Sequence, residues 1–162
     1  GVLAHRGAQG AGPVAGVGAE LALGDRGLLV VVDDLDLMVS FYCDDLGLVE
    51  LNRVESNAPP EGNHTGIPGS RRTLVFVGFE GGHRIELVKY HEPASADRDD
   101  DMTRVGTNHI CFNVEDIEKV HADLSARGIE FVTEPIIRKT DNGRHGIVYA
   151  QDPEGNWLEF IE

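Results

Sequence analysis

The chain has only two cysteines among its 162 residues, Cys43 and Cys111, and they lie far apart in the sequence. Two such cysteines are too few for a disulfide framework and lack the close spacing of a metal-binding pair. We interpret both as small buried apolar residues, which suits a reducing, cytoplasmic compartment. Long apolar stretches are missing too, since no run approaches the roughly 20 residues that a membrane-spanning helix requires.

Positive charge is scarce, with 14 Lys and Arg residues against 28 Asp and Glu residues and a formal net charge of −14. Such a surface repels phosphate backbones and anionic lipid headgroups, so we expect neither a nucleic acid nor a membrane as partner. The acidic run at residues 97–101 is interpreted as a solvated loop. A phosphate-binding loop, a nucleophile elbow and zinc-finger spacing are also lacking.

The length of the chain fits one domain, and a change in composition separates that domain from an N-terminal tail. Residues 1–26 are rich in Gly and Ala and lack the compact apolar block of a signal peptide, so we predict a flexible tail there. A single domain is predicted over residues 27–162. It consists of module one (27–92), an acidic linker (93–105) and module two (106–162).

The two modules repeat one order of predicted elements, a strand, a helix and three more strands. Asp34 and Asp116 are each suited to cap the helix, and Gly47 and Gly128 to end it. Residues 152–156 predict a tight turn before the last strand. The strands are predicted at 28–32, 48–54, 72–79 and 83–90, and again at 108–114, from 129–132 onward, at 145–150 and at 157–161.

The last strand of each module carries one carboxylate between large apolar residues, Glu86 in the first and Glu159 in the second. Alternate residues of a strand point to opposite faces, so each carboxylate lies opposite its apolar neighbours. Two carboxylates at equivalent repeat positions could converge, and a buried pair would require a proton or a cation. The strand pattern is equally consistent with two carboxylates that face solvent.

His109 opens the first strand of module two and by alternation shares a face with Cys111. A single histidine at such a place is more often structural than a ligand. One histidine together with two carboxylates on one concave sheet suits a divalent metal, namely zinc, nickel, cobalt, manganese or ferrous iron.

Several of these stretches resemble the vicinal-oxygen-chelate superfamily, which contains glyoxalases, bleomycin-resistance proteins and extradiol dioxygenases. Residues 108–117 resemble the first strand and helix start of its module, as do residues 32–48. The turn at 152–156, followed by Trp157-Leu158-Glu159, resembles the closing hairpin, the most specific signature of the family. The resemblance covers residues 28–162. It implies an α+β fold in which two tandem β-α-β-β-β modules form a curved, cup-shaped mixed sheet with helices outside.

The resemblance also implies a metal site with ligands from the first and last strands of both modules. His109, Glu159 and Glu86 match three of the four ligand places, and the fourth falls on Gly27, which has no side chain. Water or substrate could fill the gap, Asp25 or His5 could substitute, or the site could be degraded. His64 lies in a loop that borders the substrate pocket in the resembling enzymes, although an exposed loop histidine is the simpler reading.

The function expected from the resemblance is that of a metal-dependent lyase or isomerase of the glyoxalase or epimerase type. It would act on a small oxygenated substrate through a metal-stabilised enediolate, with Glu159 moving the proton. One alternative is a metal-free protein that binds a small molecule such as an antibiotic, and another is an extradiol-type dioxygenase. A homodimer is expected, since the family often completes its cups between chains.

Overall fold

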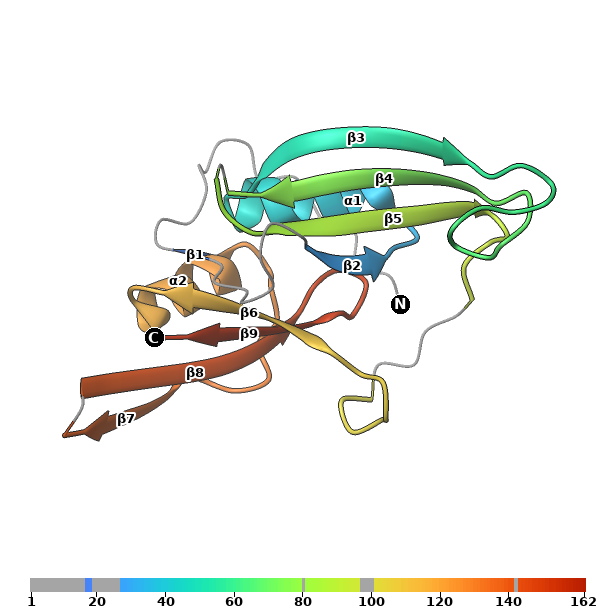
Figure 1. Cartoon of the computed structure of the whole chain (residues 1–162). Helices are drawn as coiled ribbons and strands as arrows, with labels where there is room; N and C mark the ends of the chain where they lie inside the picture. The colour runs from blue at the N-terminus through green and yellow to red at the C-terminus, as the bar shows by residue number, and fades with distance from the viewer. Residues whose placement is uncertain (1–16, 19–26, 80, 97–100, 142) are drawn as a thin grey trace.

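The computed structural model describes residues 17–18, 27–79, 81–96, 101–141 and 143–162. Most of the predicted tail and residues 97–100 of the predicted acidic loop lie outside these ranges. Figure 1 shows two sheets, with the sheet of module one above the sheet of module two. None of the described helices has the length and apolar character that crossing a membrane requires.

Module one forms a four-stranded sheet in the order β2-β5-β4-β3, with one helix packed against β4 and β5. The helix α1 continues into a π-helical turn, η1. The four strands predicted for this half are confirmed within a few residues at each end. The elements are β2 (Leu28–Val31), α1 (Leu35–Ser40), η1 (Phe41–Asp45), β3 (Val49–Asn57), β4 (Arg71–Gly78) and β5 (Arg84–Glu92).

Module two repeats this order and gains a short fifth strand from the N-terminal part of the chain, where β1 (Val17–Gly18) pairs with β6. The strand predicted to begin at residues 129–132 begins later, because Ile129 is buried in the core and Phe131 forms only an isolated bridge. The elements are β6 (His109–Val114), α2 (Ile117–Ala126), β7 (Ile136–Thr140), β8 (Gly143–Gln151) and β9 (Trp157–Ile161).

Both predicted helix caps are present. The side chains of Asp34 and Asp116 each accept a hydrogen bond from the backbone N–H three residues later, at 3.0 and 2.9 Å. Gly47 and Gly128 follow the helices with φ of 81° and 91°, a conformation that side chains with a Cβ rarely adopt. The same short signals therefore start and end the helix in each module.

The two modules pack through their helix-covered faces and share one hydrophobic core. Tyr42 of module one donates a buried hydrogen bond of 3.0 Å to the carboxylate of Asp152 in module two. The carboxylate of Glu154 accepts hydrogen bonds from the backbone N–H groups of Asp33 and Asp34. These contacts hold the start of α1 and the turn η1 against the closing hairpin of module two.

The α+β class and the two β-α-β-β-β modules are thereby confirmed, with the strands divided between two sheets. Strands β2 and β6 do not pair with each other, because β6 pairs with β1 and β9. We call the side of the first sheet that carries Glu86 open face one, and the side of the second sheet that carries Glu159 open face two. Both lie opposite the shared core, since the flanking residues Ile85, Leu87, Leu158 and Phe160 are buried in it.

Candidate functional site

His109 and Glu159 lie together on open face two. Strands β6 and β9 are parallel neighbours in which Cys111 stands opposite Glu159 and His109 opposite Trp157. The His109 Nε2 atom is 3.1 Å from Oε2 of Glu159, with the histidine side chain 48 % exposed and the carboxylate 13 % exposed. Alternation along β6 turns Ile110 into the core, which leaves His109 on the open side as the sequence predicts.

Tyr149 completes this cluster, and sequence reasoning missed it. Its hydroxyl donates a hydrogen bond of 2.7 Å to Oε1 of Glu159, and its ring meets that of His109 edge to face at 5.8 Å. Strands β8 and β9 form a hairpin in which Tyr149 stands opposite Glu159. The predicted turn at 152–156 fixes this register, so counting outward from the turn would have found the pair.

Tyr149 and Cys111, the two protonated neighbours of Glu159, both have a raised pKa. The hydrogen bond to Glu159, followed by burial, raises the pKa of Tyr149 to about 12. Burial, followed by the hydrogen bond with Glu159 and its charge, raises the pKa of the Cys111 thiol to about 12. His109 and Glu159 offer an imidazole nitrogen and a carboxylate oxygen side by side, and both are common ligands of divalent metals.

Glu86 lies on the other sheet. On β5 it stands beside Leu29 of β2 and Phe76 of β4. Across the described parts of the chain, no three His, Cys, Asp or Glu side chains gather in a position to hold a metal ion. Glu86 therefore does not join His109 and Glu159 within one chain, because the modules share a core on their helix sides and their open faces are separate.

The fourth ligand place of the resembling family has neither a side chain nor room for one. A Cβ atom added to Gly27 would stand 1.7 Å from the carbonyl oxygen of Arg84, well inside van der Waals contact. The proposed substitutes, Asp25 and His5, lie outside the described residues.

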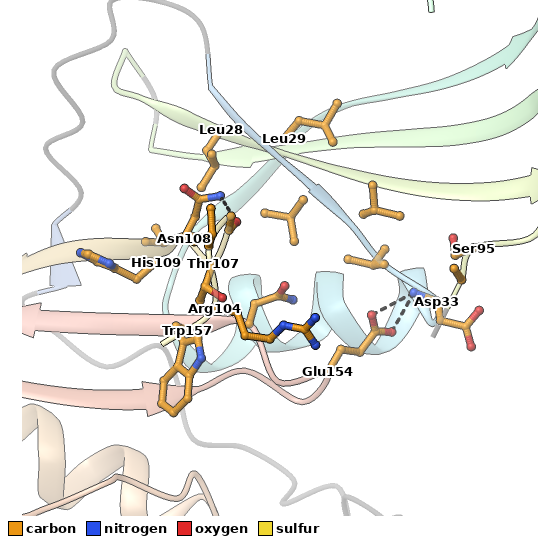
Figure 2. Close-up of a pocket in the computed structure, with 18 residues that line it drawn as sticks. Leu28, Leu29, Asp33, Ser95, Arg104, Thr107, Asn108, His109, Glu154 and Trp157 are labelled. Carbon is orange, nitrogen blue, oxygen red and sulfur yellow. Dashed lines mark hydrogen bonds between the residues drawn. The ribbon is translucent and has the colours of Figure 1, made fainter. Parts of the chain in front are cut away.

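A cavity of about 1040 Å³ lies between β2 and the start of β6. Figure 2 shows Leu28 and Leu29 on one side, with Trp157 and the segment from Arg104 to His109 on the other. Neither Glu159 nor His64 belongs to its wall. We therefore place the candidate site at the His109–Glu159 pair on open face two, and the cavity is an adjoining space whose wall includes His109.

His64 lies in the loop between β3 and β4. Its Nε2 atom is 3.3 Å from Nη2 of Arg72, a residue of β4 that is 5 % exposed. The structure thus places His64 beside open face one and away from the His109–Glu159 pair.

Comparison with known proteins gives a consistent result. The model of the Glyoxalase/Bleomycin resistance protein/Dioxygenase superfamily matches residues 27–160. A lactoylglutathione lyase of Haemophilus influenzae is 30 % identical over 131 residues, which are 81 % of this chain and 86 % of the relative. A probable lactoylglutathione lyase of a Synechocystis species is 28 % identical over 134 residues, covering 83 % of this chain and 91 % of the relative.

Solved structures show the same fold. A glyoxalase family protein from Bacillus cereus superposes with a TM-score of 0.74 at 24 % identity, covering 88 % of this chain and 95 % of that one. A trypanothione-dependent glyoxalase I from Leishmania major gives a TM-score of 0.59 at 23 % identity, covering 85 % and 84 %. By its modules, its closing hairpin and this family match, the chain belongs to the glyoxalase/bleomycin resistance protein/dioxygenase superfamily.

Proposed function

We propose that this protein is a metal-dependent lyase or isomerase of the glyoxalase or epimerase type, acting on a small oxygenated substrate. The observation that carries the proposal is the pair of a histidine nitrogen and a carboxylate oxygen 3.1 Å apart on open face two. Relatives named lactoylglutathione lyase, about as long as this chain, support the choice of reaction class.

The donor pair fits a divalent metal. Two neighbouring ligands that each stand about 2.0–2.2 Å from one ion are separated by roughly 2.8–3.6 Å in octahedral or tetrahedral geometry. The separation of 3.1 Å between His109 Nε2 and Glu159 Oε2 lies in that range. A cation held there supplies Lewis-acid stabilisation of the negative charge that develops on substrate oxygens.

Glu159 would also move the proton. A carboxylate next to a bound carbonyl compound can take a proton from the carbon beside the carbonyl and return it to the neighbouring carbon. Tyr149 orients this carboxylate, since its hydroxyl holds Oε1 while Oε2 faces His109. The two oxygens of Glu159 therefore have different surroundings.

The third ligand in this proposal is Glu86 from a second copy of the chain. The open faces of one chain do not meet, but open face one of one copy can face open face two of another. Such an isologous pair would form two equivalent sites. Apolar side chains on open face one favour a covered state, because Leu29, Val31 and Val54 are 45 %, 46 % and 39 % exposed.

Metal content tests the proposal. Mass spectrometry of protein purified without a metal-affinity tag should give about one divalent transition metal per chain. The double variant His109→Ala/Glu159→Ala should contain none. The matched control is His121→Ala/Glu134→Ala, which removes another histidine–glutamate pair of module two, 3.8 Å apart, and should leave the metal in place. No metal in the wild type, even after incubation with these metals, would refute the proposal.

Mixing two inactive variants tests the shared site. His109→Ala and Glu86→Gln should each lose metal when alone. In a mixed dimer, one of the two sites combines His109 and Glu159 of one copy with Glu86 of the other, so metal and activity should return to a fraction of the wild-type level. No recovery after subunit exchange would show that Glu86 does not act across the dimer.

A metal-free binding protein is the second candidate function. The close contact of Gly27 with Arg84 favours it, because this backbone leaves the fourth ligand place empty. Saturable binding of a small molecule by a chain that takes up no metal would select this candidate.

A further inference from the structure

Open face one has three rows of side chains with different chemistry. In the first row Glu86 stands between Leu29 and Phe76. The second row is apolar, with Val54, Leu74, Val88 and Val31 side by side, and the third contains Ser56, Arg72 and Tyr90. Four residues of β5 separate the acidic first row from the basic third row, or ~13 Å at the usual rise of a strand.

Arg72 is a buried cation without a carboxylate partner among the described residues. It is 5 % exposed, although its chain carries twice as many acidic as basic residues. Its Nε donates to the Ser56 hydroxyl at 3.4 Å, its Nη2 faces His64, and its guanidinium lies 6.0 Å from the centre of the Tyr90 ring. A buried charge is stable only when it is paired, so this arrangement calls for an anion.

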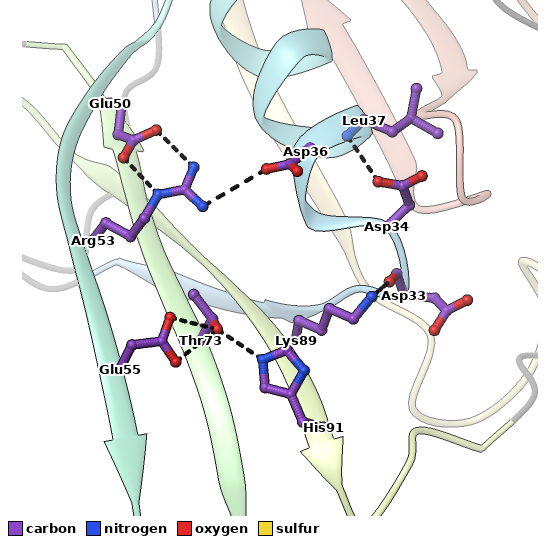
Figure 3. A network of polar contacts seen from close by, with 10 residues as sticks. All are labelled: Asp33, Asp34, Asp36, Leu37, Glu50, Arg53, Glu55, Thr73, Lys89 and His91. Carbon is purple, nitrogen blue, oxygen red and sulfur yellow. Dashed lines mark hydrogen bonds and ion pairs between the residues drawn. The ribbon is translucent and has the colours of Figure 1, made fainter.

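Two acidic groups near Arg72 in the sheet have other partners, since Glu92 pairs with Arg71 and Glu55 binds Thr73. Figure 3 shows Glu55 and His91 both bonded to the hydroxyl of Thr73, at 2.8 Å each for the closest atoms. Thr73 follows Arg72 on β4 and therefore points to the opposite face of the sheet. The Glu55 carboxylate thus lies on the helix-covered face of the sheet, where it accepts from Thr73, and does not neutralise Arg72.

The guanidinium retains donors for a ligand. Arginine has five N–H groups, of which Ser56 and His64 occupy two. Nη1 has no hydrogen-bond partner in the described structure. Among the described residues, Ser70 Oγ is the only fully buried side-chain nitrogen or oxygen atom without a hydrogen-bond partner. Nη1 of Arg72 is therefore not completely enclosed, although the residue as a whole is only 5 % exposed.

Ser70 provides an independent sign of a missing partner. It is 1 % exposed, and its Oγ makes no hydrogen bond with any described residue. It precedes Arg72 by two residues, and its carbonyl continues the β3–β4 ladder by accepting from the N–H of Ala58 at 2.7 Å. Ser70 lies one residue before β4, and continued alternation of the β3–β4 ladder would put its hydroxyl on the face of Arg72. A buried hydroxyl without a hydrogen-bond partner is energetically unfavourable. A ligand that accepts a hydrogen bond from it removes that cost.

Hydrogen bonds within the loop fix the backbone on both sides of His64. Asn63 accepts hydrogen bonds from both the N–H and the hydroxyl of Thr65, at 2.9 and 2.6 Å, and its own carbonyl accepts from the N–H of Gly66. Because a guanidinium only donates, Nε2 of His64 is the acceptor in its contact with Arg72. His64 therefore positions the guanidinium without neutralising its charge.

We infer that Arg72, Ser70 and His64 form an oxyanion-binding subsite that receives a carboxylate or phosphate group of the ligand. Glu86 lies at the other end of open face one, beyond the apolar second row, of which Leu74 and Val88 are buried and Val31 and Val54 are exposed. The substrate class is then an oxygenated carbonyl compound with an acidic group ~13 Å from the reacting end. This inference rests on the proposed function in treating the anion as part of the substrate and Glu86 as the mark of its reacting end.

The test is an anion titration that needs neither metal nor turnover. Sodium phosphate and sodium acetate are added separately to the full chain at constant ionic strength. Binding is followed by NMR of the arginine Nε–H groups and the backbone amides. At least one anion should give saturable shifts at Arg72, Ser70 and His64. Saturation by phosphate alone assigns a phosphate ester, and saturation by acetate assigns a carboxylate.

Arg72→Gln should weaken the binding by about tenfold or more, because it removes the bidentate donor. Arg71→Gln is the matched control on the same strand, since Arg71 is exposed and pairs with Glu92, and it should leave the binding unchanged. Shifts that do not saturate in the wild type, or that are equal in Arg72→Gln, would mean a non-specific ion and overturn the inference.

Ser70→Ala gives a second test should the buried arginine be needed for folding. Removal of the unpaired hydroxyl should raise Tm in anion-free buffer and reduce the rise in Tm that phosphate or acetate produces. An unchanged anion-dependent rise would overturn the assignment of Ser70. A failed titration beside a normal metal content would refute the subsite while leaving the proposed function intact.

Discussion

The two modules share their topology and differ at the first residue of the site. Each has an aspartate cap, a glycine after the helix and a glutamate in the last strand. Module two has His109 where module one has Gly27, and this histidine lies 3.1 Å from the carboxylate of Glu159. Module one instead carries the apolar and basic rows of open face one. Under the two proposals above, module two would supply the His109–Glu159 pair, and module one would supply Glu86 and the anion subsite.

Copying the histidine of module two into module one should produce the largest effect. Gly27→His forces a side chain into the carbonyl of Arg84, so we expect the free energy of unfolding to fall by on the order of 3 kcal/mol. The reverse exchange, His109→Gly, alters a half-exposed side chain and should change stability by less than about 1 kcal/mol. Urea denaturation measures both.

Gly27→Ala separates the backbone clash from the imidazole, because it adds only the Cβ atom. It should already be clearly destabilising. A Gly27→His chain as stable as the wild type would show that Arg84 yields and that module one can accept a fourth ligand.

The contact between the modules should show a smaller, pH-dependent effect. Tyr42→Phe removes a hydrogen bond to the buried carboxylate of Asp152 and should lower the free energy of unfolding by about 2 kcal/mol. Burial raises the pKa of Asp152, and the Tyr42 hydrogen bond opposes that rise. The stability linked to a raised carboxyl pKa is present below its unfolded value of about 4 and is lost as the pH rises through the folded value.

The variant should therefore lose more stability relative to the wild type at pH 7 than at pH 4, as measured by denaturation at both values. Tyr149→Phe is the control, since its hydroxyl bonds to Glu159 on open face two and joins no module contact. Equal losses for Tyr42→Phe at the two pH values would contradict the role given to Asp152.

The two cysteines offer the smallest effect, a difference in labelling rate. Burial is the main cause that raises the pKa of Cys43 in module one to about 11. At Cys111, burial and the neighbouring carboxylate of Glu159 together raise the pKa to about 12. Cys43 should react with a thiol reagent faster than Cys111 at pH 8, because the thiolate is the reacting form. Glu159→Gln should speed the labelling of Cys111 and leave Cys43 unchanged, as peptide mass spectrometry can follow. Equal acceleration at both sites would instead indicate general opening.

Much of the fold could be predicted because its signals are local. Alternation of apolar residues predicted which faces of β5 and β9 are buried. An aspartate before each helix and a glycine after it predicted where the helices begin and end. The stretch at 129–132 was taken for the start of a strand since its apolar residues alternate. They enter the core after α2 as an irregular segment, and the ladder forms at Ile136–Thr140. Alternation alone does not distinguish these two situations.

The candidate site could be predicted only in part. Strand parity placed His109 and Glu159 on one face, and the parallel pairing of β6 with β9 brought them together. Tyr149 was missed because its contact arises from the hairpin register, and Arg72 because a basic residue in a strand gives no sign of its partners. The roles of Glu86 as a metal ligand and of His64 in a substrate pocket stay predictions.

The sequence by itself determined the two modules, their helix boundaries and the outward direction of both carboxylates, since each depends on residues close together in the chain. Only the tertiary structure decided that the modules join through their helix sides, with Tyr42 bonded to Asp152. That choice depends on how two apolar surfaces from distant segments fit, which no local pattern encodes. It separates the open faces of one chain and leaves Arg72 buried without a carboxylate among the described residues.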